Sequence, residues 1–332
     1  MIRSSAPTRI DLAGGTLDIW PLHLFFDNPP TLNAAINLYA TVELKSRKDK
    51  RILIQSKDLN LAQEFSNLES LPEKHPLELI LRTVKFYAPK DGFEIVTGCQ
   101  APPGSGIGGS SALNMALHGA LNAFTQNRVP KSHLIEIARN IETQVISVPA
   151  GWQDYFPALY GGALSVRPGF SGVQFARLPL NPGEMTRRFV LCYTGKPRNS
   201  GINNWEVTKQ TVDGNRKITG CLEKIRKAAL EMEQVLLKRR WEDRFAAVFS
   251  AEWQARKALA PGISTPQMDR LIRAALRKGA LAAKVCGAGG GGCVAFFVKA
   301  DKKEQVEEEL KKQGGQVLDF QFVSRGLKVQ RV

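Results

Sequence analysis

The chain has 332 residues and a formal net charge of +15, a length that corresponds to roughly two domains of about 150 residues. Hydrophobic residues make up 43% and charged residues 23% of the chain, which predicts a globular protein with a sizeable core and excludes a disordered one. No apolar run reaches about 18 residues, so the sequence predicts no transmembrane helix.

The first ninety residues are predicted to form mostly short strands. Two helices should follow, rich in alanine and leucine or periodic in apolar residues, with Ser132 as a plausible cap of the second. Gly161-Gly162 marks a turn. The predicted elements of this half are strands at 40–44, 52–55 and 93–96 and helices at 111–125 and 133–146.

The second half alternates strands and long helices. Its predicted elements are strands at 189–193, 293–298 and 316–323, and helices at 217–237, 241–259, 267–278 and 303–312. Such an order predicts an α+β protein of two subdomains. We place the boundary near residue 185, which gives domains 1–185 and 186–332.

The strongest chemical signal is the run from Pro102 to Ala112, Pro-Pro-Gly-Ser-Gly-Ile-Gly-Gly-Ser-Ser-Ala, which leads into a predicted helix. Glycines let the backbone approach an anion closely, and a helix start offers free N–H groups and a positive dipole end. Serine hydroxyls there suit a phosphate oxygen or Mg²⁺. A purely structural glycine turn is the alternative.

Two other phosphate motifs fit this run less well. A Walker A loop ends in Gly-Lys-Ser or Gly-Lys-Thr, and the run contains no lysine. Gly104, Gly106 and Gly109 match the spacing of a dinucleotide fingerprint, which needs an acidic residue about twenty positions later. The first acidic residue after the run is Glu136, so we disfavour a dehydrogenase.

Three further segments accompany the loop. The first, residues 6–18, contains Ala-Gly-Gly-Thr-Leu-Asp and by itself predicts a strand and turn. The second, Gly151-Trp-Gln-Asp-Tyr155, places an aspartate in a turn rich in glycine and aromatics. The third, residues 284–293, holds four consecutive glycines, which suggest that the backbone passes very close to something.

In this order and spacing, the four segments resemble the GHMP kinase family of galactokinase, homoserine kinase, mevalonate kinase and phosphomevalonate kinase. The resemblance covers residues 6 to about 298 and implies an N-terminal ribosomal-protein-S5-domain-2-like subdomain followed by a ferredoxin-like one. Within the family the chain looks most like sugar kinases of the heptose-phosphate and fucose type. Gly-Gly-x-x-Asp, Pro-Pro-Gly-Ser-Gly and Gly-x-Gln-Asp carry this closer resemblance.

The resemblance implies an ATP and Mg²⁺ site. Asp154 matches the catalytic aspartate and Arg9 the basic residue next to it. Glu142 matches a glutamate that helps hold the metal, although a solvated helix carboxylate is an equal alternative. Ser110 or Ser111 would touch Mg²⁺. The residues that would wrap the ATP phosphates are Pro103, Gly104, Ser105, Gly106, Ile107, Gly108, Gly109, Ser110 and Ser111.

The same resemblance implies an acceptor site. Asp18 matches a carboxylate that binds sugar hydroxyls, and Lys196 and Arg198 are candidates for gripping a phosphate on the acceptor, unless they are ordinary loop cations. Leu17 and Tyr155 stand where related sugar kinases often carry threonine and glutamine, which leaves the sugar open. The other residues that we assign to substrate binding are Gly15, Thr16, Gln153, Gly287, Gly289 and Gly290.

We therefore expect an ATP- and Mg²⁺-dependent kinase of a sugar hydroxyl, in which Asp154 orients and deprotonates the hydroxyl and Arg9 keeps Asp154 ionised. A heptose 7-phosphate is the leading acceptor, since an anion suits the positive net charge. Fucose, galactose or a mevalonate derivative are alternatives, as is a nucleotide-binding regulator. No nucleic-acid motif occurs. Without a signal core, and with five cysteines that form no Cys-x-x-Cys pair, we expect a reduced cytoplasmic monomer or homodimer.

Overall fold

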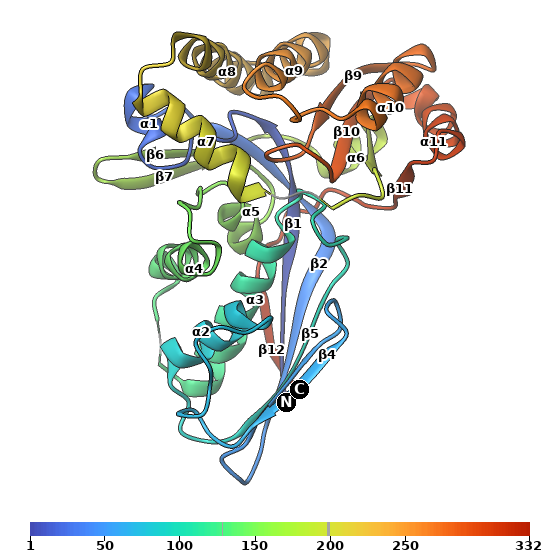
Figure 1. The fold of residues 1–332 in the computed structure, drawn as a ribbon. Coiled ribbons are helices and arrows are strands. Elements are labelled where there is room, and N and C mark those ends of the chain that lie inside the picture. The colour runs from blue at the N-terminus through green and yellow to red at the C-terminus, as the bar shows by residue number, and fades with distance from the viewer. Residues whose placement is uncertain (128, 198–199) are drawn as a thin grey trace.

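A computed structural model describes residues 1–127, 129–197 and 200–332. Its described residues form two sheets with helices packed on them, so the predicted α+β class is confirmed (Figure 1). The larger sheet has the order β12-β1-β2-β5-β3-β4, and β6 and β7 branch from β2. Its strands are β1 (Ile2–Ala13), β2 (Thr31–Ser46), β3 (Ile52–Ser56), β4 (Leu61–Phe65), β5 (Phe93–Cys99), β6 (Ala163–Gly169), β7 (Gly172–Arg177) and β12 (Lys328–Arg331).

The first two strands are long, whereas the sequence predicted mostly short strands before residue 90. Strand β2 spans 16 residues because its two halves have different partners. Residues 31–34 pair with β6 and residues 40–46 pair with β5, while β1 pairs with β2 along most of its length. The predicted strand at 40–44 is therefore one part of a continuous strand that supports both halves of the sheet.

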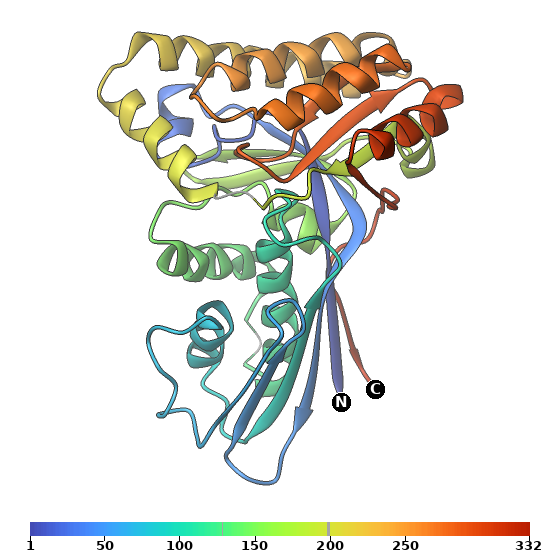
Figure 2. The ribbon, with the colours of Figure 1, turned by 45° about the vertical axis from the view of Figure 1, so that its right-hand side comes forward.

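Helices cover one face of the larger sheet (Figures 1 and 2). They bury apolar side chains such as Met115, Leu117 and Leu121 in a common core with the strands. Ser132 is not a cap: the helix begins at Lys131 after Pro130, and no side chain caps it. The helices between β1 and β8 are α1 (Leu22–Phe25), α2 (Glu78–Tyr87), α3 (Gly109–Thr125), α4 (Lys131–Ile146), α5 (Tyr155–Tyr160) and α6 (Pro182–Arg188).

The smaller sheet has the order β11-β8-β10-β9, and all its pairs are antiparallel. Figure 2 shows long helices lying across the top of the molecule above it. The predicted strand 293–298 and helix 303–312 are confirmed without change. The elements here are β8 (Phe189–Tyr193), α7 (Ser200–Val212), α8 (Arg216–Leu236), α9 (Glu242–Lys257), α10 (Pro266–Arg277), β9 (Ala280–Val285), β10 (Cys293–Val298), a 3₁₀ turn (Ala300–Lys302), α11 (Lys303–Lys312) and β11 (Gln316–Leu318).

The chain returns to the larger sheet at its end. The predicted strand 316–323 stops at Leu318, and Phe322 instead forms an isolated bridge with Ile36 of β2. Strand β12 then pairs with β1, and the Met1 amino group donates to the Val332 carbonyl at 2.8 Å, so the termini lie side by side (Figure 1).

The far end of β1 belongs to a second core, which it shares with the later helices and strands. Ile10 and Leu12 pack in one cluster with Phe245 and Phe249 of α9 and Phe297 of β10. The division at residue 185 stays a prediction. Within the described residues, no helix combines the length and apolar character that crossing a bilayer requires.

Candidate active site

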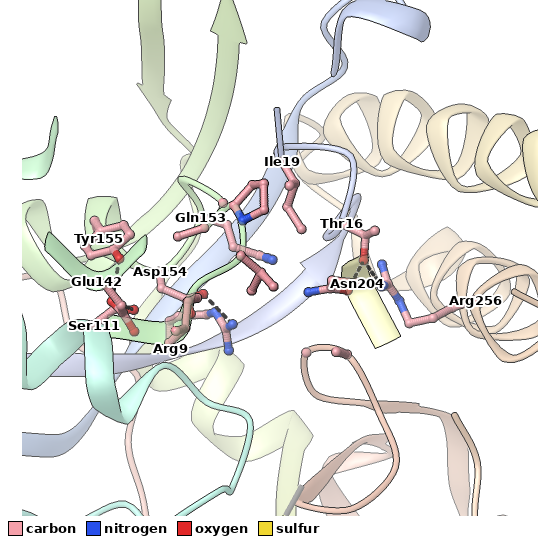
Figure 3. Close-up of a pocket in the computed structure, with 17 residues that line it drawn as sticks. Arg9, Thr16, Ile19, Ser111, Glu142, Gln153, Asp154, Tyr155, Asn204 and Arg256 are labelled. Atoms are coloured by element: carbon pink, nitrogen blue, oxygen red, sulfur yellow. Dashed lines mark hydrogen bonds and ion pairs between the residues drawn. The ribbon is translucent and has the colours of Figure 1, made fainter. Parts of the chain in front are cut away.

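Two adjoining cavities meet at three residues, Ser111, Glu142 and Asp154, which line both of them. The larger, which we call the loop cavity, has a volume of about 370 Å³ and is walled by residues 102–106 and 108–111 together with apolar residues such as Leu77 and Ile80. The smaller, which we call the inner cavity, has about 100 Å³ and is drawn in Figure 3. Asp154 thus lies at the junction of two compartments.

The glycine loop adopts a backbone conformation that favours glycine at three positions. Gly104, Gly106 and Gly108 have φ values of +64°, +80° and +78°, which L side chains rarely adopt. A Cβ at Gly108 would lie 3.4 Å from the Asp154 carboxyl. Helix α3 begins at Gly109, and no side chain caps it, so its first N–H groups remain available to an anion.

The predicted phosphate-binding residues line the loop cavity with one exception. Ile107 does not line the cavity and is fully buried in the second core. Its carbonyl accepts a hydrogen bond of 2.9 Å from the Arg9 amide, which ties the loop to β1.

Arg9 and Asp154 form an ion pair at the cavity junction (Figure 3). The Arg9 side chain is 1% exposed and also donates to the Gly106 carbonyl at 2.8 Å. Burial alone would lower the pKa of Arg9, but the carboxylates of Asp154 and Asp11 raise it above its ordinary value. Arg9 therefore remains charged and joins β1, the glycine loop and the aspartate.

Glu142 of α4 receives two hydroxyl donors in the same junction. Ser111 donates to its Oε2 at 3.0 Å, and the Tyr155 hydroxyl donates to the same oxygen. Burial raises the pKa of Glu142, and the hydrogen bonds from Tyr155 and Ser110 oppose that rise. Ser110 is exposed and Ser111 is buried.

This donor set fits a magnesium ion. Mg²⁺ prefers hard oxygen ligands and is usually held by one or two carboxylates together with substrate phosphates. Among the described residues no cluster of three His, Cys, Asp or Glu side chains forms a cage of protein ligands. One carboxylate, Glu142, beside serine hydroxyls and next to the glycine loop is the arrangement expected when phosphates supply the remaining ligands.

Asp18 does not line either cavity. Its carboxylate is fully buried, and its Oδ2 accepts hydrogen bonds from the amides of Trp152 at 2.6 Å and Gln153 at 2.9 Å. Burial raises its pKa to about 6, although these hydrogen bonds oppose the rise. The structure thus places Asp18 behind the segment that carries Asp154.

Thr16 and Gln153 do line the inner cavity, as predicted for the acceptor site. The Gln153 Oε1 atom is buried and has no hydrogen-bond partner among the described residues. Gly15 lies behind them, where a Cβ would come within 2.8 Å of Asp11 Oδ2 and 3.0 Å of the Gln153 side-chain amide.

The backbone of the third glycine segment packs against the glycine loop at Ser105. A Cβ at Gly292 would lie 2.6 Å from the Ser105 carbonyl, which accepts a 2.7 Å hydrogen bond from the Cys293 amide. The close approach that the four glycines suggested is therefore to the phosphate loop itself. Of the predicted substrate residues here, Gly287 lines the inner cavity, whereas Gly289 and Gly290 pack against Ile263.

Of the two cations predicted for an acceptor phosphate, the structure describes only Lys196. Lys196 is exposed on a loop, outside both linings, and Arg198 lies outside the described residues. Sequence reasoning missed Arg256 and Asn204, which line the inner cavity, and the contact between Tyr155 and Glu142. No local motif marks Arg256 or Asn204, because neither belongs to a glycine-rich segment.

Comparison with protein families matches two models. The model described as GHMP kinases N terminal domain matches residues 77–162, and the model described as GHMP kinases C terminal matches residues 232–316. The first match contains the glycine loop, Glu142 and Asp154, and the second contains Arg256 and the whole third glycine segment.

Individual proteins are similar over the full length. A D-glycero-alpha-D-manno-heptose 7-phosphate kinase of Campylobacter jejuni is 29% identical, covering 100% of this chain and 99% of that protein. A mevalonate kinase of Pyrococcus furiosus is 25% identical, covering 99% of this chain and 98% of that protein. The structure of a D-glycero-D-manno-heptose 1-phosphate kinase from Bacteroides thetaiotaomicron superposes with a TM-score of 0.78, at 25% identity, covering 100% of this chain and 99% of that one.

Proposed function

Because this chain belongs to the GHMP kinase family, and is thus a small-molecule kinase that phosphorylates an alcohol group, we propose that its acceptor is a sugar hydroxyl and its phosphoryl donor is ATP. A heptose 7-phosphate is the acceptor that we favour. The observation that carries this proposal is the position of Asp154, which lies where the loop cavity and the inner cavity meet.

The loop cavity is assigned to the nucleotide. Backbone N–H groups of residues 104–109 and the start of α3 would bind the phosphates. Ser110, Ser111 and Glu142 would hold Mg²⁺ beside them. When bound, the metal neutralises charge on the phosphoryl group that is being transferred.

Asp154 is assigned the role of base toward the acceptor hydroxyl. Phosphoryl transfer depends mainly on positioning and charge stabilisation, so the protein must aim one hydroxyl at the donor. Arg9 pairs with the Asp154 carboxylate, and the Asp154 side chain, which is 23% exposed, lines both cavities. Asp154 would accept the proton of the hydroxyl as that oxygen attacks.

Two observations support a sugar acceptor. The full-length similarity to the heptose 7-phosphate kinase is one, and the lining of the inner cavity by Thr16, Gln153 and Asn204 is the other, since these polar side chains suit hydroxyl groups. Lys196 and Arg198 remain our candidates for an acceptor phosphate. Mevalonate is the second candidate acceptor, favoured by the similarity to the mevalonate kinase.

The test is a panel of acceptors with ATP and Mg²⁺, in which ADP release is measured. The panel contains D-glycero-D-manno-heptose 7-phosphate, the free heptose, fucose, galactose and mevalonate. We expect the sugar phosphate to be used far better than the free sugar, and neutralising both Lys196 and Arg198 to erase that preference. Equal use of the heptose 7-phosphate and the free heptose would reject a phosphorylated acceptor. Preferential use of mevalonate would reject a sugar acceptor.

A further inference from the structure

Three residues from distant parts of the chain meet at the end of the inner cavity away from Glu142 (Figure 3). Thr16 follows β1, Asn204 belongs to α7, and Arg256 lies near the end of α9. Arg256 Nη1 donates to the Thr16 hydroxyl at 3.0 Å, and that hydroxyl donates to Asn204 Oδ1 at 3.3 Å. All three side chains line the cavity.

The guanidinium of Arg256 is held in one orientation. Its side chain is 2% exposed, Nε donates to Glu252 Oε1 at 3.0 Å, and Nη2 donates to the Gly15 carbonyl at 2.8 Å and also to Glu252. A guanidinium has five N–H donors. Within the described part of the chain, the second hydrogen of Nη1 has no acceptor, so a donor remains on a group that lines the cavity.

Thr16 adopts a conformation that its side chain disfavours. Its φ is +74°, in the left-handed region, where a β-branched residue is a genuine outlier. Such strain persists only where the surroundings fix it, and it concentrates at ligand-binding positions. Here the fixing contacts are the two hydrogen bonds of the Thr16 hydroxyl and the bond from Arg256 to the Gly15 carbonyl.

We call the end of the inner cavity formed by Thr16, Asn204 and Arg256 the corner. The charged side chains behind this corner are paired with one another. Lys284 Nζ lies 2.6 Å from Asp11 Oδ2 and 3.7 Å from Glu252 Oε2, and these three side chains are at most 1% exposed. Arg256 pairs with Glu252, and Arg9 pairs with Asp154. The described lining therefore has N–H donors without a surplus cation.

A neutral hydroxyl suits such a corner better than a carboxylate does. A carboxylate brought here would lose its hydration without gaining an unpaired positive charge. A hydroxyl oxygen would accept the Nη1 hydrogen of Arg256, and a hydroxyl hydrogen elsewhere on the same molecule would meet the unpartnered Gln153 Oε1. The corner thus favours a molecule with several hydroxyl groups.

We propose that Arg256, presented together with the Thr16 hydroxyl and the Asn204 amide, is a specificity-determining residue that binds a hydroxyl oxygen of a polyhydroxylated acceptor. This inference rests on the proposed sugar kinase function and names the end of the acceptor site that selects the sugar. Arg256 and Asn204 contact the acceptor, and Thr16 positions the guanidinium.

The test compares variants at the corner with matched controls. Thr16→Val removes the hydroxyl at nearly constant shape and Thr16→Ser keeps it. Asn204→Ala removes the amide, and Lys209→Ala alters an exposed residue of the same helix, α7. We measure KM for the best sugar of the panel and for ATP, and the dissociation constant of that sugar by calorimetry. Arg256→Lys keeps the positive charge but removes the planar guanidinium and its fixed set of N–H donors.

We expect Thr16→Val, Asn204→Ala and Arg256→Lys to weaken sugar binding at least about tenfold, which is typical when a buried hydrogen-bonding group loses its partner. The KM for ATP should stay within about twofold, and Lys209→Ala should behave as wild type. Thr16→Ser, which keeps the hydroxyl, should weaken sugar binding less than Thr16→Val does. Arg256→Lys can also destabilise the fold, because Arg256 pairs with the buried Glu252. Asn204 is partly exposed and takes no part in the buried ion pairs, so Asn204→Ala tests the inference independently of them.

Unchanged sugar binding in both Thr16→Val and Asn204→Ala would overturn the inference while leaving the sugar kinase function intact. Equal increases in the KM for sugar and the KM for ATP would overturn the inference as well, since they would indicate a structural role. If the wild type phosphorylates mevalonate and none of the sugars, the proposed function itself fails and the inference fails with it.

Discussion

Asp18 Oδ2 accepts a hydrogen bond of 2.9 Å from the backbone amide of Gln153, the residue that precedes Asp154. This bond joins the first glycine segment to the loop that carries the proposed base. A Cβ at Gly151 would lie 2.3 Å from the same oxygen, so the contact requires a glycine there. Asp18 therefore helps to fix the position of the loop that carries Gln153 and Asp154.

The buried Asp18 makes stability depend on pH. Its pKa rises from 3.8 to about 6 on folding, so between these values the folded protein holds a proton that the unfolded chain releases, and stability falls as pH rises through this window. Asp18→Asn removes the charge and keeps an acceptor for the two amides. We expect its free energy of unfolding, relative to wild type, to increase by about 3 kcal/mol between about pH 4 and pH 8.

Urea unfolding at several pH values measures this difference. Asp213→Asn, on an exposed turn, is the control for the loss of one carboxylate. A constant difference between Asp18→Asn and wild type across the window would show that Asp18 does not titrate there.

Replacement of Asp154 separates catalysis from nucleotide binding. Asp154→Asn keeps the size of the side chain and an acceptor for Arg9 but removes the base. We expect turnover to fall by about a hundredfold or more, as for loss of general base catalysis, while the dissociation constant of ATP stays nearly unchanged. Steady-state kinetics measures the turnover and calorimetry the dissociation constant of ATP. Turnover near the wild-type value would refute the role of Asp154 as the base.

The two serines of the loop should affect the nucleotide side of the reaction. Replacing both Ser110 and Ser111 with alanine should weaken use of Mg²⁺–ATP more than binding of the sugar, because hydroxyl ligands are lost. The single variants distinguish the exposed Ser110 from the buried Ser111, whose hydroxyl donates to Glu142 Oε2 at 3.0 Å. Titrations of ATP and Mg²⁺ that match wild type would mean that the loop is only structural.

Tyr155 should influence the metal through Glu142. Tyr155→Phe removes one of the two hydroxyl donors to Glu142 Oε2 and leaves Ser111 in place. Loss of a group that orients a metal ligand typically weakens metal binding by about 10–100-fold. We expect a shift of at least about tenfold in Mn²⁺ binding, measured by electron paramagnetic resonance with ATP present, and no change in sugar KM.

Tyr160→Phe is the matched control, since the Tyr160 ring stacks on Phe175 away from both cavities. Unaltered Mn²⁺ binding in Tyr155→Phe would restrict Tyr155 to a packing role.

The parts of the site that depend on local conformation could be predicted from the sequence. Gly104, Gly106 and Gly108 adopt positive φ values that few other residues tolerate, so the run of glycines before a helix predicted an anion-binding loop. Periodicity in apolar residues likewise located strand 293–298 and helix 303–312, because these elements bury a face that repeats along the chain.

Contacts between side chains far apart in the sequence could not be predicted in this way, because they depend on how the elements pack. Thr16 and Arg256 are 240 residues apart in the chain and form a hydrogen bond at one end of the inner cavity. Asp18 faces backbone amides instead of the cavity, and the last strand returns to pair with β1. Packing of the two sheets and their helices brings these groups together, and such long-range pairing leaves no periodic or conformational trace in the local sequence.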